Sequence, residues 1–413
     1  MRKLFIVLAL MLSVQMSAQR VEQPVWKERW ITTWATAQQT PVKSFMPYNN
    51  EMTFRSVRQI VKVSVGGRMV RLELSNELSS EPVEIRSVYI ANATEGWQIE
   101  PHSARYLTFH GRERVVIEPG KAVVSDAEPF ELKHLQLLAV TINYKRAPKE
   151  PTVHMGSRTT SYILKGYSNP ETSFANAFRY EKWFNIAALD VAGGQEPGIA
   201  IIGNSITDGK GSTTDKQNRW PDEMSLYLNS ERSPLQHSFK EVPHCAILNL
   251  GIGNNRVLTV GFGKPARERF DRDVLAQRGV KAVIVFEGIN DLGTSREPLT
   301  TARRLIEAYK EMADKAHRRG LRAYIATITP CKGSGYFSVG REAARQLVNA
   351  WIRNNKEYDG VIDFDELMRD PADKVQLRPE WQSDWLHPNP EGYVAMGRFA
   401  AEFIIRQIDS RRF

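Results

Sequence analysis

The feature that most constrains the fold of this chain is an apolar stretch that runs directly into small and polar residues, Gly198-Ile-Ala-Ile-Ile-Gly-Asn-Ser-Ile-Thr-Asp-Gly209. The run from Ile199 to Ile202 is typical of a strand buried in a parallel sheet, and Gly203 ends it at a tight turn. Ser205 therefore follows the carboxyl end of a strand. Open α/β sheets bind ligands at that edge, so a serine hydroxyl there is well placed for chemistry.

Spacing excludes two other motifs for this stretch. A phosphate-binding loop requires four residues between its glycines and then Lys followed by Ser or Thr, but five residues separate Gly203 from Gly209 and Gly211 follows Lys210. The nucleophile elbow of the α/β-hydrolases requires glycine two residues after the serine, where this chain has Thr207. A serine that merely caps a neighbouring turn remains an alternative.

Beyond Pro197, strand and helix signals alternate. Short apolar runs are separated by longer segments with helical periodicity, which predicts βαβ units and a parallel sheet with helices on both faces. The expected strands are 199–202, 246–250, 282–286, 322–328 and 361–364, and the clearest helices are 299–319, 340–354 and 390–408.

The first half of the chain has a different pattern. Helical periodicity is scarce, and segments rich in Val, Ile, Leu and Tyr are separated by turn residues such as Gly66-Gly67. Short strands at this spacing predict an all-β sandwich that resembles a jelly roll. The expected strands are 59–65, 69–75, 83–91, 114–117 and 137–144.

The length and composition fit this division. A chain of 413 residues with 42% hydrophobic content buries a sizeable core and is expected to form about two domains. We expect a β-sandwich domain at 24–192 and an α/β catalytic domain at 197–413, because the turn-rich segment 193–197 lacks apolar periodicity.

The amino terminus is typical of a secretory signal peptide. Arg2 and Lys3 are basic, residues 4–14 form an apolar run too short to span a bilayer, and Ala18 is a small residue at a cleavage position. We expect residues 1–18 to be removed and the protein to be secreted or periplasmic; an ordinary first helix is the alternative. No other stretch is long and apolar enough for a membrane span, so we expect no integral membrane segment in the mature chain.

Charge and cysteine content argue against several other functions. Cleavage after Ala18 would remove two basic residues and no acid, which lowers the formal net charge from +9 to +7. That excess is spread along the chain without a basic block, so we expect no nucleic acid partner. Cys245, Cys331 and the histidines show no metal-ligand spacing, so we expect no metal and no cofactor. Whether the two cysteines form a disulfide is left open.

Polar residues also follow the second and third expected strands of the α/β half. Asn290 follows the third strand, where its side-chain amide could donate to a developing oxyanion. The segment 249–255, Asn-Leu-Gly-Ile-Gly-Asn-Asn, follows the second strand, and its glycines allow backbone N–H groups to approach a substrate closely. Asparagine is also a common turn residue, so Asn290 alone does not define a site.

Asp384 and His387 precede the last expected helix. At this spacing in an irregular segment, the carboxylate can lie against the imidazole or both can face one cleft. The carboxylate would orient the imidazole, which would take the proton from a serine hydroxyl. The alternative is that Asp384 starts a turn and His387 is exposed beside Pro388.

Together these segments resemble the SGNH hydrolases, also called GDSL-type esterases and lipases. Four blocks carry the resemblance in the order of the family: 203–206, 251–255, 288–291, and Asp384 with His387. The resemblance implies a flavodoxin-like three-layer α/β/α domain. Segments 30–39, 71–91 and 183–191 are similar to a two-domain secreted group in which a β-sandwich precedes the SGNH domain.

The resemblance also implies roles for individual residues. Ser205 would be the nucleophile, His387 the general base that later protonates the leaving alcohol, and Asp384 the residue that orients His387. The oxyanion hole would comprise the backbone N–H of Ser205, a backbone N–H of the second block and the Asn290 side chain.

Two residues depart from the family pattern. Asn204 replaces the aspartate that usually precedes the serine, which removes a charge beside the nucleophile. Asn254 stands where the second block usually has glycine, and asparagine tolerates a left-handed backbone better than most residues while it keeps its N–H. Gly253 is the alternative donor.

The sequence therefore predicts a secreted serine esterase, a carboxylic ester hydrolase of short acyl esters. Acetyl groups on a polysaccharide are the expected target, so the partner would be a small acyl ester or an acylated glycan. One alternative is a lipase or lysophospholipase that acts on longer chains. Another is a decayed hydrolase that binds glycans, which Asn204 and Asn254 would favour. Four tryptophans form either a sugar-stacking surface or part of the core: Trp26, Trp30, Trp34 and Trp97.

Overall fold

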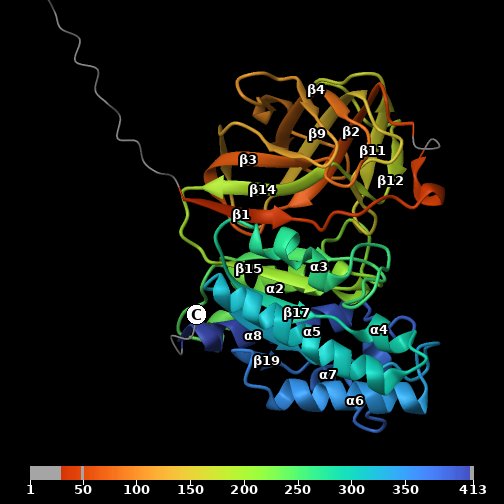
Figure 1. The fold of residues 1–413 in the computed structure, drawn as a ribbon. Helices are drawn as coiled ribbons and strands as arrows, with labels where there is room; N and C mark the ends of the chain where they lie inside the picture. The colour runs from red at the N-terminus through yellow and green to blue at the C-terminus, as the bar shows by residue number, and fades with distance from the viewer. Residues whose placement is uncertain (1–28, 48–50, 410–413) are drawn as a thin grey trace, which may run out of the picture.

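The structure is a computed structural model that describes residues 29–47 and 51–409. The expected signal peptide at 1–18 and Trp26 lie outside the described residues. Figure 1 shows two stacked parts: the strands of the first half, drawn in red to yellow-green, lie above the helices and strands of the second half.

Antiparallel sheets build the first half of the chain. Buried and partly exposed residues alternate along β3 (Gly67–Ser75), where Val70, Leu72 and Leu74 point into the core. They share that core with Val140 and Ile142 of β9 (Leu137–Arg146), which belongs to another sheet, so two sheets pack face to face. The predicted all-β sandwich is confirmed.

Two larger antiparallel sheets and one short strand pair lie in the described residues of this half. One sheet has the order β1 (Trp30–Ala35), β14 (Ile186–Ala192), β3 and β7 (Ala122–Val124), with β8 (Glu128–Leu132) also paired to β3. The second has the order β12 (Phe178–Tyr180), β11 (Ser161–Lys165), β2 (Arg55–Lys62), β9, β4 (Val83–Asn92) and β5 (Arg105–Leu107), with β6 (Val115–Ile117) also paired to β4. The short pair joins β10 (Val153–His154) and β13 (Trp183–Phe184).

The second half is built on a parallel sheet. Within the described residues its order is β16 (Ala246–Gly251), β15 (Gly198–Gly203), β17 (Val280–Phe286), β18 (Arg322–Ala326) and β19 (Gly360–Ile362). Counted from β15, this is the 2-1-3-4-5 order of flavodoxin-like folds, whose ligands bind where the order reverses, between the first and third strands. Gly203 lies opposite Gly251 and Phe286 in the register, so the loops after these three strands start level with one another.

Helices cover both faces of this sheet and complete the predicted three layers. Ile199 and Ile201 of β15 pack with one set of helices, while Ala200 and Ile202 pack with the other. The first face carries α2 (Trp220–Asn229), α7 (Phe364–Met368) and α8 (Pro390–Asp409), and the opposite face carries α3 (Ala266–Phe270), α5 (Pro298–Arg318) and α6 (Val339–Asn354). Short helices α1 (Ser205–Asp208) and α4 (Ile289–Gly293) follow β15 and β17.

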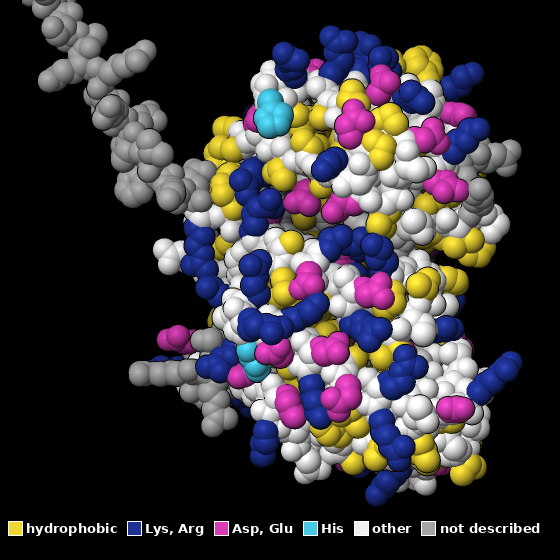
Figure 2. All heavy atoms as spheres, in the orientation of Figure 1, with side chains coloured by type: hydrophobic (Ala, Val, Ile, Leu, Met, Phe, Trp, Pro, Cys, Tyr) yellow, Lys and Arg dark blue, Asp and Glu magenta, His cyan; other side chains and the backbone are white. Residues whose placement is uncertain are grey.

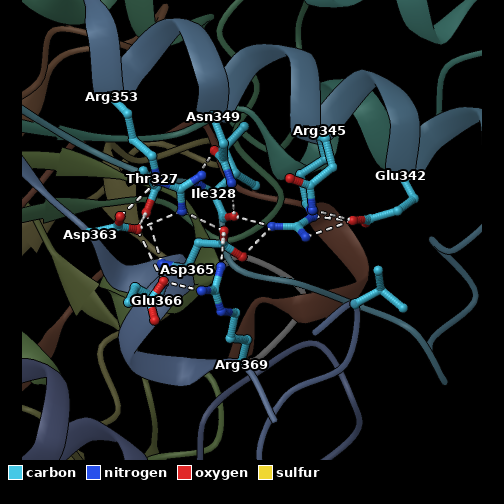
Figure 3. Close-up of polar contacts among 12 residues, drawn as sticks. Thr327, Ile328, Glu342, Arg345, Asn349, Arg353, Asp363, Asp365, Glu366 and Arg369 are labelled. Carbon is cyan, nitrogen blue, oxygen red and sulfur yellow. Dashed lines mark hydrogen bonds and ion pairs between the residues drawn. The ribbon is translucent and has the colours of Figure 1, made fainter. Parts of the chain in front are cut away.

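Three predicted strands end earlier than expected. The strand expected at 59–65 ends at Lys62 of β2. The other two lie in the α/β half, where side chains take the place of the next strand hydrogen bonds. The strand expected at 322–328 ends at Ala326, since Asn349 of α6 bonds both the N–H and the carbonyl of Ile328. The strand expected at 361–364 ends at Ile362, since Asp363 caps α7. Figure 3 shows these residues within a network of arginines and acids that joins α6 to α7.

The two halves are joined by polar bonds and by a shared apolar core. The Thr32 N–H of β1 donates to the Arg278 carbonyl at 2.9 Å, and Ser64 accepts from the Ile247 N–H at 3.0 Å. Buried Asp190 of β14 pairs with Arg278 at 2.8 Å. Ala35 of β1 lies in the core of the α/β half. The sandwich is thus built against the α/β half.

The basic residues are dispersed over the face of the molecule in Figure 2, as the sequence indicates. Figure 2 shows Lys and Arg side chains scattered among Asp and Glu over this face of the molecule. In the part of the chain that the structure describes, no helix combines the length and the apolar character needed to cross a bilayer.

Candidate active site

Ser205 begins α1, directly after β15. Asn204 caps this helix, because its side-chain oxygen accepts the N–H of Ile206 at 3.0 Å. A side chain at Gly203 would overlap Thr207, so the tight turn needs glycine there. The turn places the partly exposed Ser205 at the carboxyl edge of the sheet, beside the point where the strand order reverses.

Asn204 has a structural role that requires no charge. Its side chain is 1% exposed and serves as the helix cap. A carboxylate at this depth would need a compensating positive charge, whereas the uncharged amide needs only hydrogen-bond partners. The departure from the family pattern therefore leaves the backbone around Ser205 in place.

The structure brings Ser205, His387 and Asp384 together. Ser205 Oγ lies 2.8 Å from His387 Nε2, and His387 Nδ1 lies 2.8 Å from Asp384 Oδ2 and 3.0 Å from Oδ1. An ionised carboxylate only accepts hydrogen bonds, so Nδ1 carries the hydrogen and Nε2 is free to accept the serine proton. The geometry fits the predicted order of proton transfer.

A tight loop before α8 holds the histidine and its acid. Asp384 Oδ1 also accepts the backbone N–H of His387 at 2.8 Å, and the Ser383 N–H donates to the His387 carbonyl at 2.9 Å. Trp385 between them has a left-handed backbone, with φ of 62°, and its ring lies where a side chain at Gly333 would be. The loop fixes the imidazole through contacts that are almost entirely local.

Burial and neighbouring charges set the protonation of this pair. Burial lowers the pKa of His387 below its usual value, Asp384 opposes that shift, and the charges of Lys210 and Arg158 lower the pKa further. Burial would raise the pKa of Asp384, but hydrogen bonds from the His387 backbone and ring leave that pKa below its usual value. At neutral pH a neutral imidazole therefore faces an ionised carboxylate, the state a general base requires.

Asn290 lies at the same edge, in α4. Its side chain is 2% exposed; Nδ2 donates to the Asn255 carbonyl at 2.8 Å, and Oδ1 accepts from the Tyr336 hydroxyl at 3.0 Å. A primary amide has two N–H groups, so one remains for an oxyanion. The Asn255 carbonyl only accepts hydrogen bonds, so it fixes which end of the amide is the donor.

The second-block donors differ in what they already bind. Asn254 has a left-handed backbone, with φ of 54°, which asparagine tolerates. The Gly253 N–H donates to Asp208 Oδ2 at 2.9 Å. Since this N–H is engaged, the structure favours Asn254 over Gly253 as the backbone donor to an oxyanion.

Arg269 was missed by the sequence reasoning, because an arginine in a helix gives no sign of what it touches. Its guanidinium is fully buried and donates to the carbonyls of Gly203 at 3.1 Å and Leu250 at 2.8 Å, near the ends of β15 and β16. It also donates to Asn255 Oδ1 at 2.9 Å. Because Asn255 in turn holds Asn290, one cation ties together the three loops of the candidate site.

Buried acids surround this arginine and the second block. Asp273 pairs with Arg269 at 2.9 Å, and Glu287 lies 3.7 Å from it. Burial raises the pKa of Glu287 well above its usual range, and the charge of Arg269 opposes that shift. Asp291 accepts the N–H groups of Val257 and Leu258 at 2.9 and 3.0 Å, and burial raises its pKa to about 6. Asp273 thus holds Arg269, and Asp291 holds the loop that follows the second block.

The remaining candidates have structural explanations. Cys245 and Cys331 are buried and free, so they form no disulfide with each other. Within residues 29–47 and 51–409, no three His, Cys, Asp or Glu side chains gather as a metal site would require. Of the tryptophans, Trp34 is 7% exposed and belongs to the sandwich core, Trp97 packs on an apolar cluster, and Arg71 covers the ring of Trp30 at 3.9 Å.

A doubly wound sheet with a serine hydroxyl bonded to an imidazole, and amide donors at the same edge, is the arrangement of an α/β hydrolytic enzyme. Residues 201–395 match the family model of the GDSL-like lipases and acylhydrolases. Residues 201–395 therefore form a GDSL-like lipase/acylhydrolase domain, as the sequence blocks predicted, and the protein is a carboxylic ester hydrolase.

Solved structures are similar to the chain at low identity. A carbohydrate acetylesterase from Sinorhizobium meliloti is 14% identical, with a TM-score of 0.38 over 51% of this chain and 99% of that one. A GDSL-like lipase from Bacteroides thetaiotaomicron is 19% identical, with a TM-score of 0.35 over 51% and 88%. A family two carbohydrate esterase from Cellvibrio japonicus is 11% identical, with a TM-score of 0.37 over 92% and 98%. No curated protein was found to match the chain.

Proposed function

We propose that the protein is a serine esterase that removes short acyl groups, acetyl above all, from polar alcohols such as the hydroxyls of a polysaccharide. The observation that carries the proposal is the 2.8 Å contact between Ser205 Oγ and His387 Nε2, with Asp384 on the far side of the ring. A nucleophile, a base and a residue that orients the base are the parts that acyl transfer requires.

The proposed reaction has two stages. His387 Nε2 takes the proton of Ser205 as Oγ attacks the ester carbonyl, and the oxyanion receives hydrogen bonds from Asn290 Nδ2 and the N–H groups of Ser205 and Asn254. Collapse breaks the bond to the alcohol, which leaves with the proton from His387. Water, deprotonated by His387, then attacks the acyl-serine; collapse releases the acid and returns the proton to Ser205.

The surroundings of the base favour a polar substrate. Lys210 and Arg158 act on His387 with their positive charges. The backbone of Lys210 is held in place, since its N–H donates to the Ser205 carbonyl at 2.9 Å and its own carbonyl accepts the Tyr393 hydroxyl at 2.6 Å. Positive charges close to the base suit a polar sugar ring better than a long alkyl chain.

One observation favours a second candidate, a lipase or lysophospholipase. Val260 and Phe262, in the loop after the second block, are 69% and 45% exposed. Gly261 between them packs against the backbone of Asn254, so this apolar pair lies near the proposed oxyanion hole. A longer acyl chain would find apolar surface there.

We also propose that residues 1–18 direct secretion and are then removed. The basic start, the short apolar run and Ala18 support this proposal. Expression of the full chain in a bacterial host with a secretion pathway tests it: the exported protein should begin at Gln19 by amino-terminal sequencing. A protein retained inside the cell with Met1 or Arg2 at its start would overturn it.

Hydrolysis of p-nitrophenyl acetate, butyrate and octanoate by the purified protein tests the catalytic proposal. We expect the highest kcat/KM for acetate and a loss of about 10⁴-fold or more in Ser205→Ala. Ser212→Ala is the matched control, because Ser212 lies in the adjoining loop and its hydroxyl bonds the Gly209 carbonyl there, at 2.7 Å. This control should keep most of the activity.

The other outcomes are equally informative. A preference for octanoate that Ser205→Ala abolishes would replace the short-chain esterase with the lipase. A folded wild type with no activity above Ser205→Ala on any ester would overturn catalysis, and acetylated glycans would then be tested as binding partners.

A further inference from the structure

Asp208, at the end of α1, is held by a histidine from the sandwich half of the chain. His154 of β10 lies with Nε2 2.9 Å from Asp208 Oδ1, and each side chain is 3% exposed. Asp208 follows Ser205 by three residues in the same short helix. A contact between the two halves of the molecule thus begins at the helix that carries the proposed nucleophile.

The second oxygen of Asp208 reaches the proposed oxyanion hole. Oδ2 accepts the N–H of Gly253 at 2.9 Å, and the next peptide N–H is that of Asn254. The left-handed backbone of Asn254 depends on where the preceding peptide is held. The carboxylate is therefore a bridge from His154 to the residue whose N–H would receive the oxyanion.

The imidazole of His154 is fixed on its other side as well. Nδ1 lies 2.9 Å from the Ala37 carbonyl, and the ring stacks at a tilt on Trp183, with centroids 5.6 Å apart. A carbonyl oxygen only accepts, so Nδ1 carries a hydrogen, and the contact at Nε2 needs a second proton on either Nε2 or Asp208. The Ala37 carbonyl and the Trp183 ring belong to the sandwich half, whereas Asp208 belongs to the α/β half.

A glycine brings the sandwich segment even closer to this carboxylate. A Cβ at Gly156, two residues after His154, would overlap Asp208 Oδ2. The chain from His154 to Gly156 therefore wraps Asp208 closely, and only glycine permits that approach.

We propose that His154 is a positioning residue for ester hydrolysis: through Asp208 it holds the Gly253–Asn254 peptide in the orientation that stabilises the oxyanion. The inference rests on the esterase activity proposed above. It assigns to the sandwich half a part in the chemistry, because the hole is complete only when β10 is docked. If the His154–Asp208 contact only joined the two halves, its loss would lower the stability of the protein but not the kcat of each folded molecule.

Two substitutions at one position separate these roles. His154→Asn keeps a donor near the place of Nδ1, toward the Ala37 carbonyl, and removes the atom that faces Asp208. His154→Gln extends a donor to the place of Nε2, toward Asp208, and gives up the Ala37 contact. Both lose one hydrogen bond and the ring stack on Trp183, so both should lose similar thermal stability. They form a matched pair for the bond to Asp208.

The expected difference lies in the rate. The rates are measured with the acetate ester and corrected for the fraction of folded protein. His154→Asn should lower kcat about 10-fold at an almost unchanged KM. This decrease is smaller than the roughly 10²- to 10³-fold decrease in kcat that the loss of a whole oxyanion donor causes. The same variant should weaken inhibition by phenylboronic acid, whose tetrahedral adduct occupies the hole, by a similar factor. His154→Gln should stay within about 3-fold of wild type on both measures.

A double-mutant cycle tests whether the effect passes through Asp208. In an Asp208→Ala background, His154→Asn should lower kcat no further, because the bridge is already absent. Equal rates for the two His154 variants, or effects of His154→Asn and Asp208→Ala that simply multiply, would overturn the inference while the esterase activity of the wild type stood. A wild type without esterase activity would overturn the proposed function and this inference with it.

Discussion

The two sides of the proposed active site are built in different ways. The base side is local: His387 and Asp384 are three residues apart in one loop, and their side chains are 12% and 47% exposed. The oxyanion side is assembled from distant segments, in which buried Arg269 and Asn255 hold Asn290, and Asp208 holds Gly253. The geometry of the base side depends on one turn, whereas the geometry of the oxyanion side depends on the packing of distant segments.

This difference shows what holds the catalytic groups in position on each side of the site. A pair within one loop needs little chain ordering beyond the turn itself, and a half-exposed acid remains partly solvated. Donors that must meet a developing charge are held by a buried polar network in which every group needs a partner. Substitutions on the base side should therefore change the rate alone, and substitutions on the oxyanion side should change rate and stability together.

The largest effect is expected on the base side. His387→Gln removes the proton acceptor of Ser205 and should lower kcat/KM about 10⁴-fold or more, with little change in the free energy of unfolding. Ester hydrolysis and urea denaturation measure the two quantities. A residual rate above one hundredth of wild type would show that another group serves as the base.

Arg269→Met should cost both stability and rate. Removing this buried cation breaks its ion pair with Asp273, which keeps Arg272 as a cationic partner, and takes a donor from two carbonyls and from Asn255. The free energy of unfolding should therefore fall by about 3 to 5 kcal/mol. Arg345→Met is the control: Arg345 is equally buried and bonds the Ile328 carbonyl and Asp365 at 2.7 and 2.6 Å, in the network of Figure 3. Both variants should be destabilised in urea, but only Arg269→Met should lower kcat for each folded molecule. Equal kcat values for Arg269→Met and Arg345→Met would contradict the role of Arg269 in holding the oxyanion side.

Asn290→Ala should lower kcat by about 10² to 10³, which corresponds to one oxyanion donor, at a nearly constant KM. Tyr336→Phe sharpens this test, because it removes only the hydroxyl that orients the amide, at 3.0 Å. The smaller change should lower kcat by no more than about 10-fold. Steady-state kinetics on the acetate ester measures kcat and KM for both variants. A change in KM alone would mean that Asn290 binds the substrate instead of the oxyanion.

Asp384→Asn should have a smaller effect than loss of the base, and it should move the pH profile. Asp384 raises the pKa of His387, so its removal lets burial and the nearby cations lower that pKa further. The acid limb of kcat/KM against pH should shift to lower pH, and the plateau should fall by roughly 10²-fold or less, within the contribution of a general base. An acid limb that stayed in place would show that it does not report His387.

The sequence predicted the parts of this architecture that local patterns encode. Apolar runs such as Ile199 to Ile202 identified the parallel strands, and amphipathic periodicity identified α5, α6 and α8. The positions of Ser205 and Asn290 followed from the rule that sites gather at the carboxyl edge of the sheet. His387 was identified by its spacing from Asp384 before the last helix and by the family resemblance. Strand ends were less accurate, since Asn349 and Asp363 replace strand bonds after β18 and β19.

Contacts between distant segments could not be predicted in the same way. Arg269 lies in a helix whose pattern is the same whether its guanidinium reaches solvent or the Gly203 carbonyl. His154 occupies a two-residue strand, too short for any periodic signal. The engagement of Gly253 by Asp208 was equally invisible, because three-dimensional packing decides which N–H is used.

The most direct test of the central claim is covalent labelling of the nucleophile. The purified protein would be treated with a p-nitrophenyl alkylphosphonate, which forms a stable adduct with an activated serine, and the labelled peptide would be located by mass spectrometry. If Ser205 is the nucleophile, one adduct should form, on Ser205; it should be absent from Ser205→Ala and much slower to form in His387→Gln. A single adduct on another residue, or equal labelling of wild type and Ser205→Ala, would contradict it.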